Sequence, residues 1–145
     1  MHSMIARSGF AALALAALLG ATSLASAEQL KFKAVINAQQ EVPPNPSTAT
    51  GTADLTYDTV SKNLTWTITF KDLTGDPNVA HFHGPAEAGK NSGVALLIAN
   101  SPKSPATGSA TLTDAQAADL VGGRWYVNIH TAANRGGEIR GQVIK

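Results

Sequence analysis

Three histidines are the residues of this chain best suited to bind a metal ion. His81 and His83 form an H-x-H pair, and His130 follows in a second apolar segment. Successive side chains of a β-strand point to opposite faces, so His81 and His83 share one face while Phe82 takes the other. Imidazoles suit zinc and copper, whereas calcium prefers carboxylates. If the two segments lie together, we expect the three histidines to hold one ion, either zinc or copper.

Nearby polar residues are candidates for orienting these imidazoles. Glu87 and Glu138 could each accept the second ring N–H of a metal-bound histidine, and Asn128 could hydrogen-bond into the site. Asn128 shares the expected face of His130, together with Tyr126. The alternative is that the two carboxylates are solvated surface charges and Asn128 an ordinary surface residue. Equally, the histidines themselves could be hydrogen-bonding elements of the fold, in a metal-free module that binds a protein partner or serves a structural role.

The first 27 residues have the pattern of an export signal. Arg7 precedes an apolar run over residues 10–19, and Ala25-Ser26-Ala27 is a small-residue cleavage site. We therefore expect a cleaved signal peptide at 1–27, a single domain at 28–145, and a periplasmic or secreted protein. The remaining histidine, His2, belongs to the signal peptide. The absence of cysteine from the sequence excludes disulfides and lipid attachment through cysteine.

Charge and motif content exclude several function classes. The chain of 145 residues has 11 Lys plus Arg and 10 Asp plus Glu, and loss of Arg7 would leave ten of each. Nucleic acid or an anionic membrane would call for a basic face, so we expect neither as partner. Without cysteine or a G-x-S-x-G motif, nothing singles out a nucleophile, which argues against a hydrolase or transferase. Redox activity and the oligomeric state stay open.

Alternation of apolar and polar residues predicts strands along the whole domain. Leu64, Trp66, Ile68 and Phe70, for example, alternate with threonines and a lysine. Strands are predicted near residues 32–36, 51–57, 64–71, 79–83, 94–98, 108–112, 124–130 and 138–144. Proline-rich segments at 43–46 and 101–105 are predicted loops. About eight short strands at this spacing indicate an all-β fold, a Greek-key β-sandwich or barrel.

One segment predicts a short helix between two strands. Thr113 and Gln116 have the spacing of a capping box, and residues 115–120 favour a helix. Gly122 and Gly123 then provide a stop.

Several sequence blocks together resemble the CHRD domain, named from its occurrence in chordin. They are QEVPP at 40–44, DLTG at 72–75, AHFHGPA at 80–86, WYVNIHT at 125–131 and GEIRGQ at 137–142. The blocks keep the family order from about Leu30 to the C-terminus. The family commonly has isoleucine where Phe82 stands and a proline where Arg135 stands. Because chordin is an extracellular antagonist of growth factors, the resemblance implies a protein-binding module as the alternative to a metal site.

The arrangement of the histidines is also similar to the copper site of copper-zinc superoxide dismutases. An H-x-H on one strand and a late histidine in an exported Greek-key barrel carry this similarity. Those enzymes add a bridging histidine, a loop of zinc ligands and a disulfide, and this chain has no histidine or cysteine left for them. We therefore do not expect dismutase turnover, while a mononuclear copper site of three imidazoles remains the favoured hypothesis.

Overall fold

A computed structural model describes residues 26–145 of the chain. Nearly all of the predicted signal peptide lies outside this range. The described residues form eight strands, one α-helix and a short 3₁₀ helix, η1 (Ala38–Gln40). The strands are β1 (Gln29–Asn37), β2 (Thr50–Asp58), β3 (Asn63–Lys71), β4 (Pro77–His83), β5 (Val94–Asn100), β6 (Ala106–Thr111), β7 (Tyr126–Thr131) and β8 (Ile139–Gln142). The prediction of an all-β fold with one short α-helix is confirmed.

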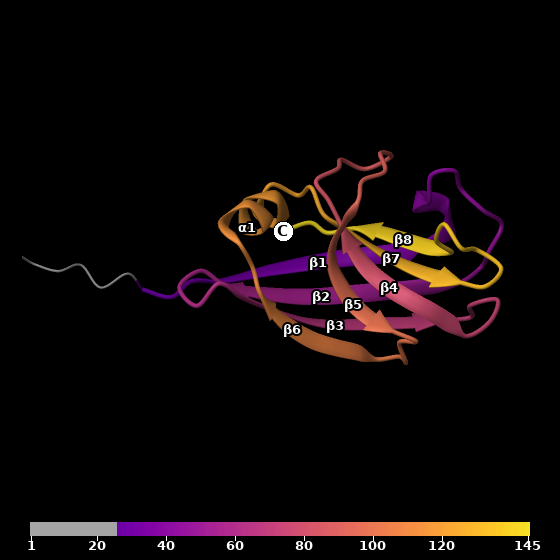
Figure 1. Cartoon of the computed structure of the whole chain (residues 1–145), viewed down its shortest axis with the longest axis horizontal. Helices are drawn as coiled ribbons and strands as arrows, with labels where there is room; N and C mark the ends of the chain where they lie inside the picture. The colour runs from indigo at the N-terminus through magenta and orange to yellow at the C-terminus, as the bar shows by residue number, and fades with distance from the viewer. Residues whose placement is uncertain (1–25) are drawn as a thin grey trace, which may run out of the picture.

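The strands form one antiparallel sheet that curls into a nearly closed barrel. The strand order is β5-β4-β7-β8-β1-β2-β3-β6. The two outermost strands, β5 and β6, come close along part of their length, as Figure 1 shows. Within the sheet β4 and β7 are hydrogen-bonded neighbours, although a long stretch of chain separates them. This pairing joins the two segments that carry the histidines.

The barrel interior is filled by the apolar set that the alternation predicted. Phe32, Leu64, Ile68 and Phe82 are at most 1% exposed. Trp66 lies across from Gly108 on β6, where a Cβ atom would overlap the indole ring. The lack of a side chain at this position therefore makes room for the largest residue type in the core.

The predicted helix is α1 (Asp114–Val121), at one end of the barrel in Figure 1. Thr113 Oγ1 accepts from the Gln116 amide at 3.2 Å, while Gln116 Oε1 accepts from the Thr113 amide at 3.0 Å. The helix ends at Gly122, and Gly123 follows with φ +71°. The capping box and glycine stop are thus both present. Within residues 26–145, no helix combines the length and apolar character needed to cross a membrane.

Candidate metal centre

The register of β4 on β7 sets the positions of the three histidines. His83 is opposite Tyr126, His81 is opposite Asn128, and Val79 is opposite His130. His130 therefore lies diagonally across from His81 on the outer face of the sheet, within reach of a long side chain. Phe82 points into the barrel, as the alternation predicted.

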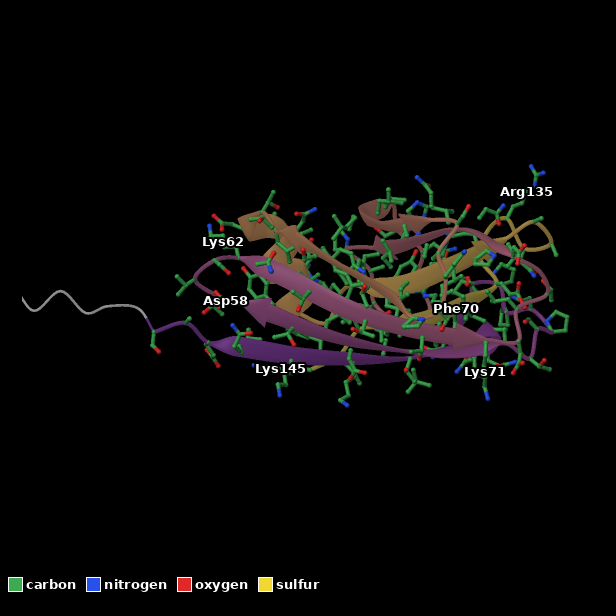
Figure 2. The ribbon with its side chains drawn as sticks, turned by 90° about the horizontal axis from the view of Figure 1, so that it is seen from below. Asp58, Lys62, Phe70, Lys71, Arg135 and Lys145 are labelled. Atoms are coloured by element: carbon green, nitrogen blue, oxygen red, sulfur yellow. The ribbon has the colours of Figure 1, made fainter. Side chains whose placement is uncertain are left out.

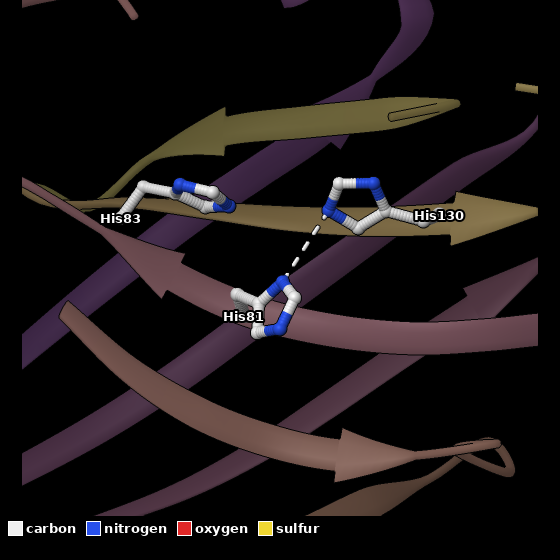
Figure 3. Close-up of side chains that lie close together, drawn as sticks. All are labelled: His81, His83 and His130. Atoms are coloured by element: carbon white, nitrogen blue, oxygen red, sulfur yellow. Dashed lines mark hydrogen bonds between the residues drawn. The ribbon is translucent and has the colours of Figure 1, made fainter. Parts of the chain in front are cut away.

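The three imidazoles converge on one space, as Figure 3 shows. Each offers a ring nitrogen, and these nitrogens lie within 4.8 Å of one another. His81 Nδ1 and His130 Nε2 are 3.5 Å apart. The ring centroid of His81 lies 5.4 Å from that of His83 and 5.3 Å from that of His130. All three side chains are half-buried.

Two of the rings are oriented by backbone carbonyls. His83 Nδ1 donates to the Ser92 carbonyl at 3.0 Å, and His130 Nδ1 donates to the Arg135 carbonyl at 2.9 Å. With the proton on Nδ1, Nε2 of each ring carries a free lone pair. His83 Nε2 is buried and has no hydrogen-bond partner among the described residues. A bound metal ion would satisfy this buried nitrogen.

The environment of the site favours neutral imidazoles. Burial lowers the pKa of His81, and the neighbouring His130 and His83 lower it further. Burial also lowers the pKa of His83, although the hydrogen bond to the Ser92 carbonyl partly opposes this. Both rings are thus poised in the unprotonated form that metal coordination requires.

The donor set and its spacing fit a zinc or copper ion. Two nitrogens bound to one ion at about 2.0 Å and a tetrahedral or trigonal angle lie about 3.3–3.5 Å apart. The 3.5 Å between His81 Nδ1 and His130 Nε2 matches that spacing. The widest separation of up to 4.8 Å requires a ring to move by about 1 Å. Three nitrogens then leave the fourth position of a tetrahedral ion without a ligand among the described histidines.

Comparison with known proteins identifies the family. The family model for the CHRD domain matches residues 32–143. The chain belongs to the CHRD domain family. No curated protein and no solved structure matches it. The comparisons thus give the similarity to superoxide dismutases no support.

The outer face of β7 in this CHRD domain is covered, although the sequence indicated a surface position for its polar residues. Tyr126 and Asn128 are each 3% exposed. Loops that follow β4 and η1, and the loop between β7 and β8, fold over them. Asn128 Nδ2 donates to Glu41 Oε1 and to the Ile139 carbonyl, and not to a histidine. Its amide group therefore holds a loop onto the sheet.

The two carboxylates suggested as partners of the histidines lie in different surroundings. Glu87 is exposed, as expected of a solvated charge. Glu138 is fully buried, so the prediction of a surface charge is wrong for it. Its carboxylate accepts from the hydroxyls of Ser47 and Thr131 at 2.6 Å and of Thr74 at 2.8 Å. Burial opposes ionisation, but these hydrogen bonds outweigh it and lower the pKa of Glu138.

Neither carboxylate hydrogen-bonds a histidine in the part of the chain that the structure describes. The Ser92 and Arg135 carbonyls accept the Nδ1 protons of His83 and His130 instead. These partners are backbone atoms, which every residue type provides, so residue identity gave no signal for them.

Glu41 and Arg140 are two further buried charges near the site that the sequence analysis did not single out. Glu41 is 6% exposed and Arg140 is 1% exposed. Burial raises the pKa of Glu41 to about 7, although the Asn128 amide and the Arg140 charge act against it. Both side chains line a cavity of about 290 Å³ beside η1. Glu41 lies in the family block QEVPP and Arg140 in the family block GEIRGQ. The family resemblance therefore included both residues but assigned a role to neither.

Proposed function

We propose that this CHRD domain binds one copper ion through His81, His83 and His130, in an exported protein that serves copper storage, transfer or redox protection. Zinc is the alternative ion. The observation that carries the proposal is the convergence of three ring nitrogens within 4.8 Å of one another. The buried Nε2 of His83, which has no hydrogen-bond partner within residues 26–145, supports it, because an unsatisfied buried nitrogen is unfavourable without a ligand.

The chemistry of the donor set favours copper over other ions. All three donors are imidazoles, which suit copper and zinc. Among the divalent first-row metal ions, Cu(II) binds a given nitrogen site most strongly. The site has no carboxylate among its donors, so hard cations such as calcium lack their preferred ligands. The half-buried position gives an ion a way in and out, as storage or transfer would need.

Titration with Cu(I), Cu(II) and Zn(II) under competition with a chelator of known affinity tests the proposal. Wild type should bind one ion, and His81→Ala, His83→Ala and His130→Ala should each lose at least tenfold in affinity. Glu87→Ala is the control, because it truncates an exposed side chain that hydrogen-bonds none of the three histidines. Equal, weak binding by all five proteins would reject the proposal. Mass spectrometry of the protein recovered from producing cells tests export, with Glu28 as the expected first residue.

One observation favours the alternative of a metal-free module. At 3.5 Å, His81 Nδ1 and His130 Nε2 can share a hydrogen bond and so satisfy each other without an ion. In that case the alanine variants lose folding stability equally with and without chelator. If copper binds the native state, an equivalent of copper above the dissociation constant raises the melting temperature of wild type alone. Melting curves with and without copper therefore separate the two functions.

A further inference from the structure

Tyr126 connects a candidate metal ligand to a buried positive charge. The rings of Tyr126 and His83 are stacked, with centroids 4.9 Å apart and planes 3° from parallel. The guanidinium carbon of Arg140 lies 3.5 Å from the Tyr126 ring centroid. Since β7 lies between β4 and β8, His83 and Arg140 approach Tyr126 from opposite sides. The three side chains form a stack that ends at the candidate site.

The stack is held in place by the loop that follows β4. The Ser92 carbonyl accepts from His83 Nδ1 at 3.0 Å and from the Tyr126 hydroxyl at 3.2 Å. Arg140 Nη1 donates to Asn91 Oδ1 at 3.0 Å, and Nη2 donates to the Lys90 carbonyl at 2.6 Å. One loop therefore fixes the imidazole, the phenol ring and the guanidinium relative to one another.

The charge of Arg140 is only partly compensated. Its hydrogen-bond acceptors are a neutral amide and a carbonyl, and within residues 26–145 it forms no salt bridge. Glu41 is a carboxylate that acts on it from a greater distance, and burial raises the pKa of Glu41 to about 7. Glu41 is thus partly protonated near neutral pH and offsets only part of the positive charge.

A buried positive charge at this distance discriminates between ions of different charge. The two stacking distances put the guanidinium carbon at most about 8 Å from the His83 ring centre. An ion bound to His83 Nε2 lies about 3 Å from the ring centre, and so at most about 11 Å from the guanidinium carbon. At about 8–11 Å and an effective dielectric constant of about 20, each additional positive charge on the ion meets a repulsion that weakens binding roughly 10- to 30-fold. A divalent ion carries one more such charge than a univalent ion.

We propose that Arg140 and Tyr126 are positioning residues for this site: the Tyr126 ring fixes the orientation of His83, and the Arg140 charge biases the site toward a univalent ion, Cu(I) over Cu(II). This inference rests on the proposed function. The two residues contribute separately, since the ring acts on every ion equally, whereas the charge acts on the difference between ions.

Affinities for Cu(I) and Cu(II), measured by competition on the same folded variants, test the charge effect. Arg140→Gln should lower the ratio of Cu(I) to Cu(II) affinity by roughly 10- to 30-fold. Arg140→Lys should keep the ratio within threefold of wild type. Asn91→Asp places a carboxylate on the guanidinium from an exposed loop position and should lower the ratio without removing a buried side chain. This variant decides the question if Arg140→Gln fails to fold.

Three further comparisons complete the test. Lys71→Gln is the control, because the Lys71 side chain is exposed at the end of β3, as Figure 2 shows, so that solvent screens its charge. Ag(I) and Zn(II) repeat the comparison with ions that do not change oxidation state, and the same shift is expected. Tyr126→Leu should weaken both copper affinities by about tenfold and leave their ratio unchanged. Tyr126→Phe, which keeps the ring, should leave both within threefold.

The outcomes separate this inference from the proposed function. If wild type binds copper and both Arg140→Gln and Asn91→Asp keep the wild-type ratio within threefold, the role of Arg140 is rejected and the copper site stands. If Tyr126→Leu binds as tightly as wild type, the role of Tyr126 is rejected. If wild type binds none of the four ions, the proposed function fails and this inference fails with it.

Discussion

Replacing Glu41 by glutamine should stabilise the protein at alkaline pH and have little effect near pH 4. The Glu41 carboxyl is 6% exposed, and burial raises its pKa to about 7. A group whose pKa rises on folding contributes stability that is fully present below its unfolded pKa and is lost as pH rises through its folded pKa. Here the loss runs from about pH 4.5 to above pH 7. Glutamine stays neutral throughout, and its Oε1 can still accept from Asn128 Nδ2.

The size of the effect follows from the two pKa values. Each tenfold change in proton affinity is worth about 1.4 kcal/mol. A rise from 4.5 to about 7 therefore amounts to about 3 kcal/mol at pH 8, and to less than 1 kcal/mol at pH 5. A difference of this size is a large part of the stability of an ordinary domain.

Urea unfolding of the chelator-treated protein at pH 5 and pH 8 measures this difference. Both proteins contain the same three histidines, so the comparison of Glu41→Gln with wild type isolates the effect of Glu41. Glu87→Gln is the matched control, because Glu87 is an exposed glutamate on a neighbouring loop. If Glu41→Gln and wild type lost the same free energy of unfolding between the two pH values, the argument from burial would be wrong. A gain as large in Glu87→Gln would indicate a general charge effect.

Two other predictions follow from the site and its cover. Copper affinity should fall as pH drops below about 6.5, because protons compete for the imidazoles. Burial lowers the pKa of His81 and His83, so protons compete for these two rings only at a lower pH than for a free imidazole. Competition titrations from pH 8 to pH 5 measure this fall, and a constant affinity would contradict three-imidazole coordination. Gly137→Ala should cost about 2 kcal/mol of unfolding free energy, since Gly137 has φ +125° and its Cβ would lie 2.6 Å from Glu41 Oε1. Gly136→Ala, where a Cβ meets open space, is the control, and equal losses in a urea titration would refute the steric argument.

The sequence predicted the strands well because each strand has one face in the barrel interior. The alternation of Trp66 and Ile68 with threonines reflects burial directly, as does the alternation of Phe82 with His81 and His83. The same alternation was sufficient to place the three histidines on the outer face. Their convergence depends on the pairing of β4 with β7, which the sequence left as a condition.

The surroundings of the histidines could not be predicted in the same way. Alternation separates the two faces of a sheet, but it does not say whether a loop covers the outer face. Asn128 and Glu138 therefore had the pattern of surface residues, although loops bury both. Periodicity carries no information about how an irregular loop folds, and the polar residues under it are stabilised by hydrogen bonds that only the folded chain provides.

The pairing of β4 with β7 also determines at which stage of synthesis and folding the site can form. His81 and His130 are 49 positions apart, and β7 enters the sheet between β4 and the C-terminal strand β8. A chain that still lacks β7 and β8 contains His81 and His83, but it lacks His130 and the strand that positions His130 beside them. Occupancy by a metal ion would then mark a completed domain, and a truncated or unfolded copy would be distinguished by its failure to retain the ion.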